Sequence, residues 1–80
     1  MNVTKDLFDF DCHIILFEKG GVQINNNECL NGWWMQTTEN KIEIGGMGWE
    51  CKLGGVFETL EAAVDYINKH KDIRMTPWPG

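Results

Sequence analysis

The sequence contains no serine and only one arginine, Arg74. The absence of serine excludes a serine nucleophile, and a single arginine cannot form the multi-arginine clamp that holds a phosphate group. The chain has seven basic residues against twelve acidic ones, which gives a net charge of −5. Because binding a nucleic-acid backbone requires clustered lysine and arginine, this balance disfavours direct DNA or RNA binding.

Long hydrophobic runs are also missing. The longest apolar run, Ile14 to Phe17, has four residues, far short of the roughly 20 that a membrane-spanning helix needs. No signal-peptide-like hydrophobic stretch follows Met1, and the cysteines, Cys12, Cys29 and Cys51, are odd in number. We therefore expect a soluble protein in a reducing, cytoplasmic setting, with no membrane partner.

The residues that could support catalysis or metal binding do not form a recognisable motif. The cysteines lack the short C-x₂₋₄-C spacing of zinc sites, and neither His13 nor His70 supplies it. Cys12 and His13 are neighbours in an expected strand, so their side chains point to opposite faces. The stretch Gly46-Met47-Gly48 lacks the third glycine of a nucleotide-binding fingerprint. We expect no cofactor, no metal and no enzymatic activity.

What is present describes one small domain over residues 1–80, with 42% hydrophobic residues. Alternating or continuous apolar runs between glycine-rich and asparagine-rich breaks predict a meander of about five strands. We expect the first run to be a central strand with both faces partly covered, preceded by a loose, acidic entry segment of about nine residues. The strands expected are 10–17, 22–24, 32–37, 41–44 and 49–53, with turns at 18–21 and 38–40 and an end to the sheet at Gly54-Gly55.

One helix of about eleven residues is predicted after the strands. Thr59 is a favourable N-cap, and Glu61 lies in the first turn, where the helix dipole favours an anion. Asp65 and Lys69 are spaced for an ion pair one turn apart. The apolar stripe of the helix consists of Leu60, Ala63, Val64 and Ile67. The opposite, polar side consists of Glu61, Asp65, Asn68 and Lys69.

These elements predict an α+β fold, in which an antiparallel sheet has its single C-terminal helix packed on one face. Such a short helix covers one face of a sheet only. If Trp33 faces the helix, alternation places Trp34 on the uncovered face, exposed among charged residues. The uncovered face also holds one of two sets of residues from the first strand: His13, Ile15 and Phe17, or Cys12, Ile14 and Leu16. Trp33 and Trp49 are expected in the core, and Trp78, between two prolines, either docks back or protrudes.

An exposed tryptophan with nearby carboxylates is typical of a protein-binding surface, because an aromatic anchor supplies affinity and charge steers the encounter. The stretch 6–11 mixes acidic and aromatic residues, as docking segments do, although a solvated approach to the first strand explains it as well. The partner-binding residues predicted are Trp34 as anchor, Glu43, Glu50, Asp9 and Asp11 as charged contacts, and Phe17.

The acidic meander, its glycine break and the Thr-capped helix in Phe57–Ile67 resemble small phage and mobile-element proteins, including anti-CRISPR proteins. The resemblance implies a function class: a stoichiometric inhibitor that binds a nucleic-acid-processing complex in the cytoplasm of a bacterial host. Such an inhibitor acts by charge mimicry, by an aromatic anchor, or by both.

Two other functions fit the same sequence. The uncovered sheet face could pair with that of a second copy, forming a homodimeric structural or adaptor module. Alternatively, Trp34 and Trp78 could serve as stacking platforms for a small ligand such as a carbohydrate.

Overall fold

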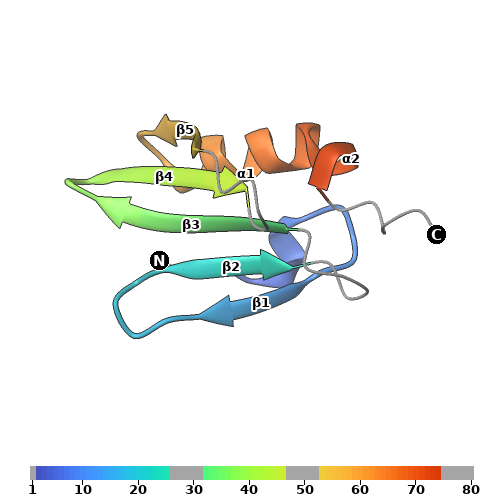
Figure 1. Ribbon diagram of the computed structural model, residues 1–80, viewed down its shortest axis with the longest axis horizontal. Coiled ribbons are helices and arrows are strands. Elements are labelled where there is room, and N and C mark those ends of the chain that lie inside the picture. Colours follow the sequence, from blue (N-terminus) through green and yellow to red (C-terminus); the bar gives the residue numbers. More distant parts are fainter. Residues whose placement is uncertain (1, 26–31, 47–52, 75–80) are drawn as a thin grey trace.

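The computed structural model describes residues 2–25, 32–46 and 53–74. A short 3₁₀ helix, η1, comes first, followed by five strands, the helix α1 and a final helical turn, α2 (Figure 1). The strands form one antiparallel sheet in the order β1-β2-β3-β4-β5, so the predicted five-stranded meander with one main helix is confirmed. The bounds are η1 Lys5–Leu7, β1 His13–Leu16, β2 Val22–Asn25, β3 Gly32–Thr38, β4 Lys41–Gly46, β5 Leu53–Phe57, α1 Leu60–Lys69 and α2 Lys71–Arg74.

The first strand is an edge strand, and the prediction of a central strand is wrong. β1 pairs with β2 on one side, and no other described strand lies along its outer side. Its residues Ile15 and Leu16 are 41% and 63% exposed, so its faces are not both covered. The apolar run indicated a strand correctly, but in a meander the first strand of the chain takes the edge regardless of its composition.

Both predicted turns are present. At the β1–β2 turn the Phe17 amide donates to the Gly21 carbonyl at 2.8 Å, and Gly20 has a φ of 85°, a conformation that glycine adopts without steric cost. The β3–β4 hairpin turns through Glu39 and Asn40, which have φ values of 50° and 66°. Two consecutive positive φ angles match the tight hairpin turn whose twist suits the flanking strands.

The last strand differs from the prediction. Gly54 and Gly55 lie inside β5 instead of ending the sheet, and the expected strand 49–53 falls outside the described residues except for Leu53. A Cβ on Gly54 would lie 3.2 Å from a ring carbon of Trp33, and one on Gly55 would lie 3.0 Å from the Phe57 ring. These glycines therefore leave room for aromatic rings packed against the strand.

The helix α1 forms as its sequence predicts. The Thr59 hydroxyl accepts a hydrogen bond from the Ala62 amide at 3.1 Å, which caps the first turn. Lys69 pairs with Asp65 at 2.9 Å, one turn apart. The apolar stripe is confirmed, with its last three members buried: Ala63, Val64 and Ile67.

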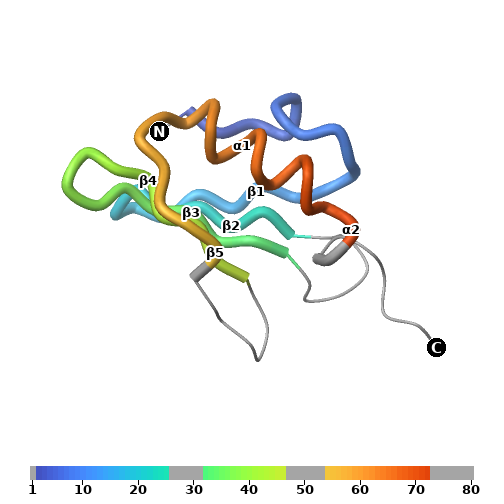
Figure 2. Tube along the Cα trace, turned by 90° about the horizontal axis from the view of Figure 1, so that it is seen from above, coloured from blue at the N-terminus to red at the C-terminus, as the bar shows by residue number. Residues whose placement is uncertain are grey.

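The residues before β1 are not loose, which corrects the prediction for the N-terminal segment (residues 2–12). Its Val3, Phe8 and Cys12 are buried in the core, and Phe10 is half-buried with its ring centroid 5.4 Å from that of Phe8. Figure 2 shows this segment beside α1 on the same side of the sheet. The aromatic residues of the stretch 6–11 therefore pack against the chain's own core.

The core lies between the sheet and a roof that consists of α1 and the N-terminal segment. Ile24, Met35 and Ile44 contribute from the sheet and Ile67 from α1, all of them almost completely buried. The ring of Tyr66 meets the Trp33 ring edge-on at 5.9 Å and lies against Phe57 and His70. In Figure 2 no described element packs on the opposite side of the sheet, which we call the open face.

Candidate functional site

The open face contains Trp34, as alternation predicts. Trp33 is buried beneath the roof, and the next residue, Trp34, therefore points the other way. The register aligns Trp34 with Gln23 on β2 and with Gly45 on β4. Trp34 is half-buried, whereas the prediction was an exposed side chain among charged residues. Gln23 beside it is also half-buried, and Gly45 has no side chain to compete with the indole for space.

The adjacent row on the open face contains the predicted carboxylate Glu43. It pairs with Gln36 across the β3–β4 hairpin, and the Gln36 side-chain nitrogen donates to a Glu43 oxygen at 3.3 Å. Glu43 is half-buried, and Val56, its partner on β5, is 49% exposed. The row thus offers one oriented carboxylate beside an accessible aliphatic side chain.

Phe17 extends the same surface at the β1 edge. Ile15 lies in line with Gln23 and Trp34 across the sheet. Phe17 is two residues further along the chain, so its side chain lies on the same face, and its backbone amide is hydrogen-bonded to Gly21. Phe17 is 47% exposed. Of the two alternatives for β1, the set His13, Ile15 and Phe17 therefore faces the same side as Trp34, while Cys12 is buried on the other side.

The predicted site is divided, because Asp9 and Asp11 belong to the N-terminal segment and not to the open face. Asp9 forms an ion pair with Lys71 at 3.1 Å, and Asp11 lies 4.0 Å from Lys5. Both carboxylates are exposed, and their ion pairs lie on the roof side of the molecule, away from the open face. The remaining predicted contact, Glu50, lies outside the described residues.

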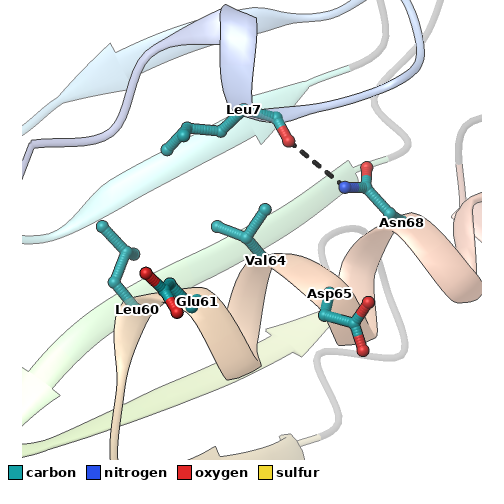
Figure 3. A pocket seen from close by; sticks show the side chains of 6 residues that line it. All are labelled: Leu7, Leu60, Glu61, Val64, Asp65 and Asn68. Atoms are coloured by element: carbon teal, nitrogen blue, oxygen red, sulfur yellow. Dashed lines mark hydrogen bonds between the residues drawn. The ribbon is translucent and has the colours of Figure 1, made fainter.

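A groove in the roof was not predicted from the sequence. It holds about 270 Å³ between η1 and α1, with aliphatic side chains from both elements and two carboxylates at its border (Figure 3). Asn68 closes one end, because its amide donates to the Leu7 carbonyl at 3.2 Å. The sequence placed Asn68 on the solvent side of the helix, and no local pattern links it to residue 7. The lining residues are Leu7, Leu60, Glu61, Val64, Asp65 and Asn68.

Two observations on the described residues concern metal ligands and the Cys12 thiol. Within 2–25, 32–46 and 53–74, no three His, Cys, Asp or Glu side chains are grouped so as to hold a metal ion. Burial raises the pKa of the Cys12 thiol, with a smaller opposing effect from Lys5 and a raising effect from Asp11. A buried, protonated thiol is a poor nucleophile. The open face is the candidate site because its chemistry suits binding.

Comparison with protein-family models, with curated proteins and with solved structures gives no match to this chain. Neither α1 nor α2 is long and apolar enough to span a membrane. Trp78, the second tryptophan of the expected carbohydrate platform, lies outside the described residues.

Proposed function

We propose that this chain is a non-enzymatic binding protein that inhibits a nucleic-acid-processing protein complex, and that it contacts the complex through its open face. The observation that carries the proposal is the position of Trp34. This residue lies mid-sheet on a face without a described cover, between the exposed Phe17 and Ile15 on one side and Glu43 on the other. An amphipathic aromatic ring on an accessible sheet face that also carries exposed apolar side chains is typical of an interface centre.

Aromatic anchoring accounts for this surface better than charge mimicry. Only one of the predicted carboxylates that the structure describes, Glu43, lies on the open face, and Gln36 orients it. Asp9 and Asp11 lie in the roof, so on this proposal they add to the negative field that attracts a basic partner without contacting it. We therefore expect affinity to depend mainly on Trp34, and the rate of association to depend on the net charge.

The test is an affinity capture from a bacterial host, followed by measurement with the purified complex. The wild-type protein should capture a complex with a basic, nucleic-acid-binding surface and inhibit its activity at equal stoichiometry. Trp34→Asp should weaken that binding by at least about 30-fold, the effect of losing a hot-spot side chain. Trp34→Phe should retain part of the affinity. Circular dichroism and thermal unfolding would verify that both variants fold.

The matched control lies on the other side of the molecule. Glu61 borders the roof groove, and Glu61→Lys changes the charge there without touching the open face. Its affinity for the complex should stay close to that of the wild type. Loss of binding in Glu61→Lys with full binding in Trp34→Asp would move the site to the roof and overturn the proposal.

A further inference from the structure

The outer edge of β1 has the features of a strand that pairs with another strand. Edge strands are normally protected by charges, proline, bulges or a covering segment. The strand itself, His13-Ile14-Ile15-Leu16, contains no lysine, carboxylate or proline, and its pairing with β2 shows no bulge. In Figure 1 β1 lies at one edge of the sheet, and no described segment runs along its free side.

The backbone hydrogen bonds show which residues present free groups along this edge. The Phe17 amide donates to Gly21 of the β1–β2 hairpin, so Phe17 points its backbone groups inward. In an antiparallel ladder the direction alternates from residue to residue. Ile15 therefore bonds inward to β2, while Ile14 and Leu16 direct their N–H and C=O groups outward.

We propose that the occupant of this edge is a second copy of the chain, whose β1 pairs antiparallel with the first about a two-fold axis at Ile15. Residues whose backbone N–H and C=O groups point outward must lie opposite such residues of the second copy, and this restricts the register of the two strands. With the axis at Ile15, Ile14 of each copy lies opposite Leu16 of the other and the two exchange backbone hydrogen bonds. Leu16, the most exposed apolar side chain of the edge at 63%, then packs beside Ile14 of the other copy. The two-fold axis repeats this contact on its other side.

Side chains and charges favour this register over its neighbours. On the open-face side, Ile15 meets its own copy, and Phe17 lies opposite His13. Asp11 of one copy is brought to the turn that contains Lys19 of the other, and the symmetry repeats this contact. A two-fold axis at Ile14 would place Asp11 opposite Phe17 instead, and one at Leu16 would place Ile14 opposite Glu18. The register at Ile15 therefore combines apolar pairs with opposite charges.

The resulting dimer has one continuous sheet. Because the two-fold axis is perpendicular to the sheet, both open faces lie on the same side, and the Trp34 side chains of the two copies belong to one surface. The dimer does not require the function proposed above, because sedimentation measures it without a partner complex, although Ile15 and Phe17 flank both the β1 edge and the Trp34 surface. It differs from face-to-face pairing, which would cover both tryptophans.

The test is the oligomeric state of the full chain, measured by sedimentation velocity over a series of concentrations. The wild type should show a monomer–dimer equilibrium. Ile15→Lys places two like charges at the axis and should raise the dimer dissociation constant by at least about tenfold. The control, Val56→Lys, adds the same charge to the other edge strand at a similarly exposed position and should leave the dimer intact.

A charge exchange tests the register itself. Asp11→Lys should weaken the dimer by bringing two positive charges together, and Lys19→Asp should weaken it likewise. The double variant Asp11→Lys with Lys19→Asp restores opposite charges and should recover the wild-type dissociation constant. A wild type that is monomeric at every concentration overturns the proposal. A dimer that survives Ile15→Lys but is lost in Trp34→Asp overturns it in favour of face-to-face pairing.

Discussion

Asn68 on α1 holds the backbone on either side of Phe8. Its side-chain nitrogen donates to the Leu7 carbonyl at 3.2 Å, and its side-chain oxygen accepts from the Asp9 amide at 3.1 Å. Leu7 and Asn68 are 61 residues apart in the chain. One side chain thus links the N-terminal segment to the C-terminal helix and completes the roof above the core.

We predict that Asn68→Ala loosens the N-terminal segment. Removing both hydrogen bonds should lower the free energy of unfolding by about 1 kcal/mol, the usual net effect of such bonds at a partly exposed site. Hydrogen exchange at the Asp9 amide should become faster. Lys69→Ala, at the next position, should leave that amide protected. Unchanged exchange at Asp9 in Asn68→Ala would contradict this role.

The Thr59 cap gives a second prediction. Thr59→Ala removes the acceptor of the Ala62 amide and should lower the free energy of unfolding in urea by about 1 kcal/mol. Thr59→Ser keeps a hydroxyl at the same position and should restore most of the stability. Equal stability of the alanine and serine variants would show that the hydroxyl contributes nothing to α1.

The β3–β4 turn should accept a stabilising change. Glu39 and Asn40 both have positive φ, and Asn-Gly is the pair that favours this geometry. We expect Glu39→Asn combined with Asn40→Gly to raise the free energy of unfolding by about 0.5 kcal/mol, because less backbone strain is carried in the folded state. The contrasting variant is Gly20→Ala at a φ of 85°, which should destabilise the protein. Thermal unfolding would compare the two.

Burial of Cys12 predicts a loss of stability at alkaline pH. Its pKa in the folded chain is raised above the ordinary value of 9.0, mainly because burial disfavours the thiolate. The contribution of the protonated Cys12 thiol to the free energy of unfolding is therefore complete below pH 9.0. It is lost as the pH rises through the raised pKa, since the thiol of the unfolded chain ionises first. Cys12→Ala should be less stable at neutral pH but show a shallower decline above pH 9.0 than the wild type. Parallel curves for the two proteins would argue against it.

Local patterns predicted the local elements well. The Thr59 cap, the apolar stripe of α1 and the glycine-containing β1–β2 turn depend on residues close together in the chain, and all three are confirmed. The direction of Trp34 followed from alternation with Trp33, and its half-buried state did not, because burial depends on residues of neighbouring strands.

The errors concern relationships between distant parts of the chain. The composition of β1 indicated a strand but not its place at the edge. Gly54-Gly55 was interpreted as a break like Gly20-Gly21, although its small size serves the packing of Trp33 and Phe57. The docking of the N-terminal segment depends on Asn68, a residue with no sequence signal that connects it to residues 7 and 9.

The link between Asn68 and Leu7 has a consequence for synthesis of the protein. Each strand of the sheet pairs with its neighbour in the chain, so the hairpins can form in the order in which they are translated. Val3 and Phe8, in contrast, wait for the helix α1, which is translated after the strands of the sheet. These two apolar residues are thus made before the sheet but are sheltered from water only after α1 has been made.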